Sequence, residues 1–212
     1  HRVAGVDFEL GVFTNLTQDH LDFHGTMEEY ARCKALLFKQ SKTAVINLDD
    51  KWAQYMTESA RQAGCRVVSY AQEHNEADVV AKDIRLSARD VRFCAVETGG
   101  IQRIRLGIPG RFSVYNALCV IASGVALGYS MEKCAQSLET AEGVKGRMEV
   151  LPTDGDYTIL IDYAHTPDAL ENVLRSVRGF CKGRLIVAFG CGGDRDPIKR
   201  PIMGQMAAEN AD

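Results

Sequence analysis

The sequence predicts an α/β protein with a mostly parallel sheet flanked by helices and a small antiparallel sheet, followed by the start of a doubly wound domain. The segment 44–70 has the pattern strand, helix, strand, which joins neighbouring parallel strands. Residues 77–108 alternate apolar and polar side chains between short turns, which indicates an antiparallel meander with one solvent-facing side. Residues 148–210 alternate short apolar runs with helical patterns, as doubly wound domains do.

The first two predicted elements are a strand at 8–14 and a helix at 26–40. The strand is an apolar run that contains a single acidic residue. Thr26 and Glu29 have the spacing of a capping box, so the helix should begin at Met27. The elements that follow are a strand at 44–48, a helix at 50–63 with Gly64 as its C-cap, and a strand at 65–70.

A domain boundary is predicted between two groups of elements in the second half. Largely apolar helical patterns cover 112–127 and 131–141. The segment 142–146 then contains two glycines, so we expect one domain at 1–144 and a second at 145–212. In the second domain the predicted elements are strands at 148–151, 158–161 and 185–189 and helices at 167–180 and 198–210.

The composition is that of a globular protein without a nucleic-acid or membrane signature. The 212 residues are 46% hydrophobic and 25% charged, which suffices for one large domain or two smaller ones. A net charge of −3 offers no basic footprint for nucleic acid. No apolar run reaches about 18 residues, and no signal peptide is present, so a soluble, cytoplasmic protein is expected. The seven scattered cysteines form no C-x-x-C pair and are expected to be buried free thiols in a reducing cytosol.

Both ends of the sequence are expected to lie inside a longer protein. The chain starts at His1 without a methionine and stops at Asp212, just after a helical pattern where another strand is due. No G-x-x-x-x-G-K-[ST] motif occurs, so the chain holds no phosphate-binding P-loop of its own.

Lys34 is unusual because it falls inside the apolar stripe of the helix predicted at 26–40. At about 100° per residue it shares a face with Met27, Tyr30, Ala31, Leu37 and Phe38. A lysine in that place is costly unless it is paired or chemically changed. A desolvated lysine loses its proton easily, and the neutral amine can add CO₂ to give a carbamate, an oxygen ligand suited to Mg²⁺. The alternative is a side chain that reaches past its neighbours to the surface.

A group of acidic and histidine residues precedes this helix. Asp19, His20, Asp22 and His24 have the spacing D-H-x-D-x-H, which matches no strong zinc pattern. Mg²⁺ takes few protein ligands and keeps waters and phosphates, so one histidine and one anionic group would suffice. A carbamate on Lys34 would supply that anion.

Two turns at strand ends are candidate ligand sites, because open α/β sheets bind ligands beyond the carboxyl ends of their strands. In the first, Asp162 and His165 lie between a strand and a helix that starts with Thr166-Pro167-Asp168, and a helix N-terminus favours phosphate. They would either contact a ligand or brace the turn. The second turn is the segment GCGGDRD, which presents Arg195 after a glycine cluster and lacks the dinucleotide fingerprint. A plain structural turn is the alternative there.

Asn116 and Arg147 are further candidates with equally open alternatives. Asn116 lies inside the apolar helix predicted at 112–127, where it is either a satisfied core polar group or a group facing a ligand. Arg147 follows the predicted boundary and is either a ligand contact or a surface charge.

Five segments resemble, in order and spacing, the Mur ligase family, from the first residues of the chain to the last. They are TNLTQDHLDFHGTMEEYARCKALLF, GRFSVYNALCVIA, GVKGRMEV, IDYAHTPDALENVL and FGCGGDRDPIKRPIMG. The resemblance implies most of a central ATP-binding domain and the start of a Rossmann-like C-terminal domain. The family's P-loop and N-terminal domain would lie before this chain, so the chain alone is expected to be inactive.

The resemblance is to the tripeptide-forming branch of the family, which works in peptidoglycan synthesis. It implies ATP-dependent addition of meso-diaminopimelate to UDP-MurNAc-L-Ala-D-Glu through an acyl phosphate, with Mg²⁺ as cofactor. The alternatives are the L-lysine-adding version or another ligase of the Mur and folylpolyglutamate synthase superfamily. The segment GCGGDRD, followed by Lys199-Arg200-Pro201, favours diaminopimelate.

Roles for eight residues follow from the resemblance alone. Lys34, as N6-carboxylysine, and His20 would be catalytic metal ligands. Arg2 would contact the uridine-nucleotide substrate, and Arg195 would hold the carboxylate of the incoming diaminopimelate. The expected ATP contacts are Asn116, Arg147, Asp162 and His165.

Overall fold

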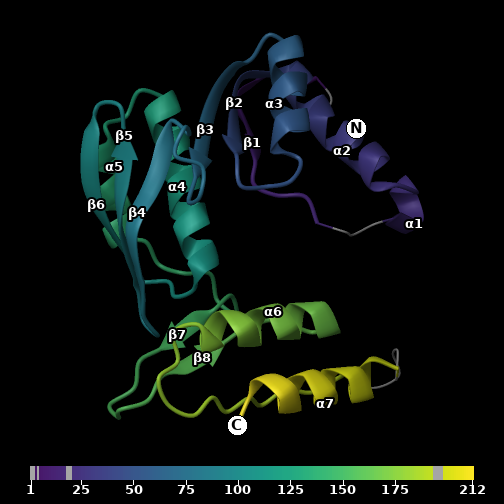
Figure 1. Ribbon diagram of the computed structural model, residues 1–212, viewed down its shortest axis with the longest axis vertical. Helices are drawn as coiled ribbons and strands as arrows, with labels where there is room; N and C mark the ends of the chain where they lie inside the picture. The colour runs from purple at the N-terminus through teal and green to yellow at the C-terminus, as the bar shows by residue number, and fades with distance from the viewer. Residues whose placement is uncertain (1–2, 4, 18–20, 193–197) are drawn as a thin grey trace. The chain divides into compact units, whose positions relative to one another are not determined.

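The computed structural model describes residues 3, 5–17, 21–192 and 198–212 (Figure 1). Contacts within the chain divide it into two compact units. The first unit comprises His1–Ile84, Phe93–Ile104 and Val114–Glu139, and the second comprises Arg85–Arg92, Arg105–Ser113 and Thr140–Asp212. Arg2, His20 and Arg195 lie outside the described residues.

A parallel sheet forms the beginning of the chain. The strands β1 (Phe8–Phe13), β2 (Ser41–Asn47) and β3 (Arg66–Ala71) pair in parallel in that order. The helices α2 (Met27–Ala35) and α3 (Ala53–Gln62) connect them and share one core with their apolar sides. The strand–helix–strand pattern predicted at 44–70 is therefore confirmed.

The predicted meander extends this sheet instead of forming a separate one. Its first strand, β4 (Val79–Leu86), pairs in parallel with β3, with Tyr70 opposite Val79. The strands β5 (Val91–Glu97) and β6 (Gly100–Leu106) follow as neighbours, so the sheet has the order β1-β2-β3-β4-β5-β6. The two connections are short loops of the kind that joins antiparallel strands.

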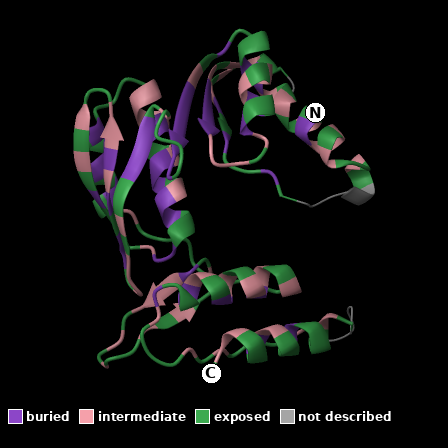
Figure 2. Cartoon of the chain, in the orientation of Figure 1, coloured by how far each residue is buried: buried purple, intermediate pink, exposed green. Residues whose placement is uncertain are grey.

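Two helices follow the meander. The first, α4 (Arg111–Ala126), is apolar and buries Val114, Leu118 and Ile121, and Figure 2 shows buried residues along it as along β2 and β3. Gly128 follows the end of this helix, with a φ of 89°, a left-handed conformation that glycine adopts without strain. The second helix, α5 (Met131–Glu139), buries four residues of one face.

The second unit contains a two-stranded sheet and two helices. The strands β7 (Glu149–Leu151) and β8 (Ile159–Ile161) pair antiparallel. The helix α6 (Pro167–Arg178) buries Leu170, Leu174 and Val177, and α7 (Lys199–Asn210) buries Met203 and Ala207. Small cores form around Met148, Val177 and Phe180 and around Leu170, Leu174 and Met203.

Two element predictions are wrong in whole or in part, and one element was missed. The helix predicted at 26–40 ends at Ala35 and continues as the 3₁₀ helix η1 (Leu36–Gln40). A short helix, α1 (Leu21–His24), was not predicted. No strand forms at 185–189, because the backbone of Leu185 bonds to Asp212 rather than to a neighbouring strand, with N···Oδ2 and O···N distances of 2.7 and 2.8 Å.

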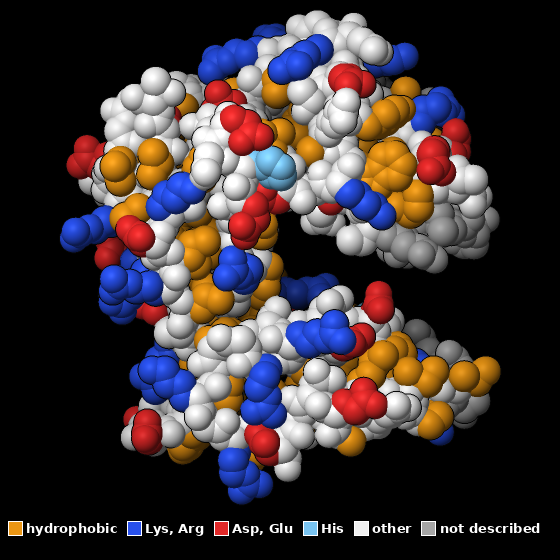
Figure 3. Space-filling view, in the orientation of Figure 1, with side chains coloured by type: hydrophobic (Ala, Val, Ile, Leu, Met, Phe, Trp, Pro, Cys, Tyr) orange, Lys and Arg blue, Asp and Glu red, His pale blue; other side chains and the backbone are white. Residues whose placement is uncertain are grey.

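The thiols and the helices bear on the expectations of a reduced, soluble protein. All seven cysteines are free thiols, as expected, but only Cys65 and Cys134 are buried, so the expectation that all are buried is wrong for the other five, which are half-buried. Within the described residues, no helix is both long and apolar enough to span a membrane. On the face drawn in Figure 3, lysine and arginine side chains are interspersed with acidic ones, so that face presents no continuous basic surface.

Candidate functional site

The turn after β8 is fixed by the carboxylate of Asp162. Its two oxygens accept hydrogen bonds from the backbone N–H groups of Met148 and Ala164, both at 2.9 Å. Met148 is buried and has a φ of 47°, a left-handed conformation that is unfavourable for a residue other than glycine. Asp162 is half-buried, so these bonds are partly shielded from water. Asp162 therefore braces the turn and also holds the strained residue beside Arg147.

Arg147 and His165 both contact the ring of Tyr163, which follows Asp162 in this turn. The Arg147 guanidinium is 5.5 Å from the centroid of the Tyr163 ring, and the His165 ring meets it edge-on at 5.1 Å. His165 Nδ1 is also 3.0 Å from the Tyr163 carbonyl oxygen, and the Tyr163 N–H donates to the carbonyl of Gly146. All three side chains are exposed. The structure thus brings together three predicted ATP contacts, Arg147, Asp162 and His165.

The helix α6 begins directly behind this turn. Its N-cap Thr166 accepts a hydrogen bond from the N–H of Ala169, and Pro167 occupies the first turn, as predicted. The N-terminus of a 12-residue helix carries partial positive charge. Together with the exposed Arg147 guanidinium, it makes this edge of the second unit suitable for a phosphate or carboxylate.

The first residues of α7 contact the same turn and the glycine segment. Lys199 Nζ donates to the carbonyl oxygen of His165 at 2.9 Å. Arg200 Nη2 donates to the carbonyl oxygen of Gly192 at 3.4 Å. Arg195, the predicted contact for the incoming amino acid, lies outside the described residues.

Lys34 is exposed, so its ammonium is not desolvated within the apolar stripe that the periodicity indicates. Its ammonium lies 5.1 Å from the centroid of the Tyr30 ring, and the only buried residue of α2 is Ala31. A lysine chain is long enough to reach past the tyrosine to water, which is the alternative left open by the periodicity. The start of this helix was predicted correctly, since Thr26 accepts a hydrogen bond from the N–H of Glu29. The Glu29 carboxylate bonds Arg32.

The predicted metal pair is only half described, because His20 lies outside the described residues. Within the part of the chain that is described, no group of three or more histidine, cysteine, aspartate or glutamate side chains could hold a metal ion. A carbamate on Lys34 and one imidazole would still be a suitable donor set for Mg²⁺, which needs few protein ligands. The exposed amine of Lys34 is accessible to CO₂.

Asn116 is exposed on α4. The interpretation as a satisfied core group is therefore wrong, and its amide is accessible to a ligand. Asn116 belongs to the first unit, whereas Arg147, Asp162 and His165 belong to the second. Asn116 is therefore not among the residues that form the cluster around Tyr163 within the second unit.

The sequence did not predict a polar cluster at the carboxyl ends of β2 and β3. The Asp49 carboxylate accepts hydrogen bonds from the N–H groups of Gln72, Glu73 and His74, the shortest at 2.6 Å, and lies 2.7 Å from His74 Nδ1. Burial opposes ionisation of Asp49, but the bonds from His74 and the backbone outweigh it and lower its pKa. The hydrogen bond to Asp49 raises the pKa of His74. The signal in the sequence that could have indicated this cluster is the pair Asp49-Asp50, which follows the buried strand β2.

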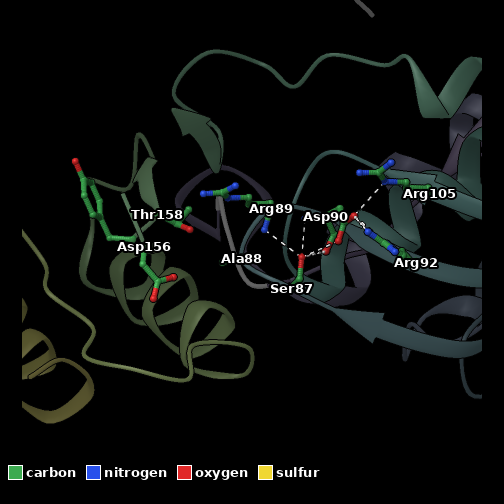
Figure 4. Close-up of a pocket in the computed structure, with 9 residues that line it drawn as sticks. Ser87, Ala88, Arg89, Asp90, Arg92, Arg105, Asp156 and Thr158 are labelled. Atoms are coloured by element: carbon green, nitrogen blue, oxygen red, sulfur yellow. Dashed lines mark hydrogen bonds and ion pairs between the residues drawn. The ribbon is translucent and has the colours of Figure 1, made fainter. Parts of the chain in front are cut away.

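A cavity of about 470 Å³ lies in the second unit, between the β4–β5 loop and residues 156–158 (Figure 4). Asp90 accepts hydrogen bonds there from Ser87 Oγ at 2.7 Å and from the guanidinium groups of Arg92 and Arg105 at 2.8–3.1 Å. Burial raises the pKa of Asp90, but these bonds outweigh it and leave the pKa below its usual value. None of the predicted site residues lines this cavity.

Comparison with protein families decides the assignment of the chain. The model of the Mur ligase middle domain matches residues 1–124, and the model described as Mur ligase, glutamate ligase domain, matches residues 146–212. The chain belongs to the Mur ligase family. The family predicted from the five sequence segments is therefore confirmed, and the α/β architecture agrees with it. The exact boundary predicted at 144/145 stays a prediction.

Within the Mur ligase family, the chain is similar to ligases that carry one particular name. It is 46% identical to the UDP-N-acetylmuramoyl-L-alanyl-D-glutamate--2,6-diaminopimelate ligase of Caldanaerobacter subterraneus subsp. tengcongensis, over 100% of this chain and 43% of the relative. A solved structure of a ligase of that name matches with a TM-score of 0.81 and 37% identity, over 100% of this chain and 44% of that one.

A more distant match concerns the fold alone. It is the MurF ligase of Thermotoga maritima in complex with ADP, with a TM-score of 0.69, 17% identity and coverage of 98% of this chain and 47% of that one. The chain spans less than half the length of the curated relatives it matches.

Proposed function

We propose that the protein containing this chain is an ATP-dependent ligase that joins meso-diaminopimelate to UDP-MurNAc-L-Ala-D-Glu. The observation that carries the proposal is the similarity of the entire chain, at 46% identity, to a ligase named for this acceptor. The exposed Arg147 and His165 beside the N-terminus of α6 support it, because such an edge suits the anionic groups of ATP. The L-lysine-adding version is the second candidate.

The proposed reaction has two steps. The D-glutamate carboxylate attacks the γ-phosphorus of ATP, ADP leaves and an acyl phosphate forms. The amine of diaminopimelate then attacks the acyl carbon, a tetrahedral intermediate forms, and inorganic phosphate leaves with formation of the amide. No side chain forms a covalent bond with a substrate in these steps, so the protein acts by positioning the substrates and stabilising the developing charge.

The proposed residue roles follow the two steps. Asp162 keeps the turn in shape, while Arg147 and His165 contact ATP, with Asn116 at the adenine. Arg195 holds the carboxylate of the amino acid and thereby directs its amine, a task that suits the two-pronged guanidinium group. Arg2 contacts the uridine nucleotide.

Magnesium completes the proposed site. His20 and the carbamate of Lys34 would hold it, and when bound it would offset the negative charge of the triphosphate. The contribution of Lys34 is then to supply oxygen ligands rather than to act as a nucleophile.

The proposal concerns the whole protein. The 212 residues contain no P-loop motif, and we expect no ligase activity from them alone. The whole enzyme would work in the cytoplasm on a peptidoglycan precursor. It would thereby serve cell-wall biogenesis and, through it, cell shape and division.

A product assay with the full-length protein tests this function. Incubation with UDP-MurNAc-L-Ala-D-Glu, ATP, Mg²⁺ and meso-diaminopimelate should give the tripeptide nucleotide and ADP in equal amounts, measured by mass spectrometry and chromatography. With ¹⁸O in the D-glutamate carboxylate, one labelled oxygen should appear in the released phosphate, as an acyl phosphate requires. ADP formation without an amide product, or phosphate free of label, would contradict the proposal.

A further inference from the structure

Asp49 joins three segments of the first unit through one carboxylate. It lies two residues beyond the end of β2 and accepts hydrogen bonds from the backbone N–H groups of residues 72–74, in the loop after β3, at 2.6–3.3 Å. His74 Nδ1 lies 2.7 Å from it, and the side chain of Tyr115 on α4 also hydrogen-bonds to it. Only 7% of the Asp49 side chain is exposed. The end of β2, the loop after β3 and α4 therefore meet at this carboxylate.

An ionised aspartate is the residue type that this arrangement requires. A carboxylate has two oxygens with about four acceptor positions, and it presents no donor to the N–H groups around it. An asparagine of the same shape would turn an NH₂ group toward these donors and leave some of them unpaired. The bonds keep the pKa of Asp49 below its usual value although burial opposes ionisation. Both the charge and the two oxygens are therefore in use.

The bond from Tyr115 fixes α4 in a way that apolar packing does not. The helix buries Val114, Leu118 and Ile121, and the hydrophobic effect that favours their burial has no preferred direction. A hydrogen bond, in contrast, weakens steeply when its length or angle changes. The Tyr115 bond to Asp49 therefore determines how this turn of α4 is rotated relative to the ends of β2 and β3.

Asn116 follows Tyr115 directly on α4, and it is exposed. Both residues belong to one helical turn of the first unit, so a rotation that moves Tyr115 also moves Asn116. Asp49 itself lies at the carboxyl ends of the parallel strands β2 and β3, the edge at which open α/β sheets bind ligands. The amide of Asn116 is thus presented by a turn whose orientation depends on Asp49.

We propose that Asp49 is a positioning residue for ATP, which acts through Tyr115 on the turn of α4 that presents Asn116 to the adenine. The inference rests on the proposed function, in which Asn116 contacts that base. An asparagine amide can pair with adenine through two hydrogen bonds at once, so it has to meet the base at a defined angle. A displacement of about 1 Å can cost roughly 100-fold in rate, so a small rotation of α4 is enough to weaken the contact.

The test uses the full-length enzyme and a matched control. Asp49→Asn keeps the shape of the side chain but not its charge, and Tyr115→Phe keeps the ring but not the hydroxyl. Each is made alone and together with Asn116→Ala. Asp78→Asn is the control, because the Asp78 carboxylate also accepts bonds from a neighbouring strand, from the N–H and hydroxyl of Ser69 at 2.7 and 2.6 Å.

The measurements separate nucleotide binding from turnover and from stability. Binding of ADP with Mg²⁺ is measured by calorimetry in the absence of amino acid and uridine nucleotide. The melting temperature, kcat and the KM values of the three substrates are measured for the same variants. A residue that only supported the fold would change the melting temperature, whereas a positioning residue for ATP changes the affinity for the nucleotide selectively.

The loss should be confined to the nucleotide. Asp49→Asn and Tyr115→Phe should each weaken ADP binding and raise KM for ATP by about 5- to 20-fold, with the other two KM values within about twofold. In the Asn116→Ala background neither should weaken ADP binding further, because the group that they position is gone. Asp78→Asn should bind ADP like the wild type.

Three results would overturn the proposal. They are unchanged ADP binding in Asp49→Asn and Tyr115→Phe, an equal loss in Asp78→Asn, and an undiminished loss when Asp49→Asn is added to Asn116→Ala. If Asp49→Asn does not fold, Tyr115→Phe decides by the same criteria. Wild-type enzyme that binds ADP but forms no amide with diaminopimelate would contradict the proposed function instead, and the ADP measurements would still decide the role of Asp49.

Discussion

The carboxylate of Asp162 accepts a hydrogen bond from the backbone N–H of Met148 at 2.9 Å, across 14 residues of sequence. Met148 has a φ of 47° and is buried, so its conformation is unfavourable and needs support from its surroundings. Asp162 gives that support while its other oxygen holds the N–H of Ala164. One side chain thus links the entry to β7 with the exit from β8.

Replacement of this carboxylate should destabilise the second unit. Asp162→Ala removes two charge-assisted bonds from a half-buried group, for which we expect a loss of about 2 kcal/mol in unfolding free energy. Asp162→Asn keeps one acceptor oxygen and should lose less. Urea denaturation measures both, with Asp168→Ala, an exposed position in the first turn of α6, as the control. A loss for Asp162→Ala no larger than for the control would show that the bonds contribute little.

The Asp49–His74 pair should make the stability of the first unit depend on pH. His74 has a raised pKa, so its contribution is complete below its unfolded pKa, near 6.5, and is lost as pH rises through the folded value. Asp49 has a lowered pKa, so its contribution is present above about pH 4 and is lost as pH falls through the folded value. The pair therefore stabilises most between about pH 4 and 6.5.

An NMR titration of the His74 ring measures the cause directly. We expect a pKa above 6.5 in the wild type and a return toward 6.5 in Asp49→Asn. His74→Gln should also flatten the decline of stability between about pH 6.5 and 8. An unchanged His74 pKa in Asp49→Asn would refute the assignment of the shift to this hydrogen bond.

Gly124 permits the close approach of α4 and α5. A Cβ at this position would lie 2.4 Å from Cys134 Sγ, well inside contact distance. Gly124→Ala should therefore destabilise the protein by about 1–3 kcal/mol in spite of the better helix propensity of alanine. Thermal unfolding of Gly124→Ala, Cys134→Ala and the double variant forms a cycle. The double variant should be more stable than the sum of the single effects, and simple additivity would exclude the clash.

Lys34 should be required for turnover in the full-length enzyme through its carbamate. Lys34→Ala and Lys34→Arg should both lose at least about 100-fold in kcat, because neither side chain can add CO₂. Short carboxylic acids should partly restore the alanine variant. Lys39→Ala, at an exposed lysine of η1, serves as the control. Near-normal activity of Lys34→Arg would mean that the positive charge, rather than the carbamate, is what the site uses.

The local signals of the sequence predicted most elements but not their partners. Thr26 and Thr166 marked true helix starts, because a cap depends on residues three positions apart. The run LIVAF at 185–189 has strand composition, yet a strand also needs a hydrogen-bonded neighbour, and Leu185 bonds to Asp212 instead.

In the candidate site, too, the sequence predicted local features but not the contacts between distant segments. The turn at Asp162 and His165 was predicted from its position between a strand and a helix start. Its bonds to Met148 and Lys199 depend on how distant segments fold together. Lys34 was placed by periodicity, which gives the face of a helix but not how far a long side chain extends along it. The nest of N–H groups around Asp49 depends on the backbone course of the loop after β3, which the predicted pairing of β2 with β3 does not give.

The choice between meso-diaminopimelate and L-lysine is the sharpest test of the proposed ligase activity. The full-length enzyme is given meso-diaminopimelate and L-lysine in competition, with UDP-MurNAc-L-Ala-D-Glu and ATP at saturation, and the two tripeptide nucleotides are quantified by mass spectrometry. We expect at least about a 100-fold preference for diaminopimelate, which carries a second carboxylate that an arginine can bind and that L-lysine lacks. Equal use of both amino acids, or a preference for lysine, would contradict it.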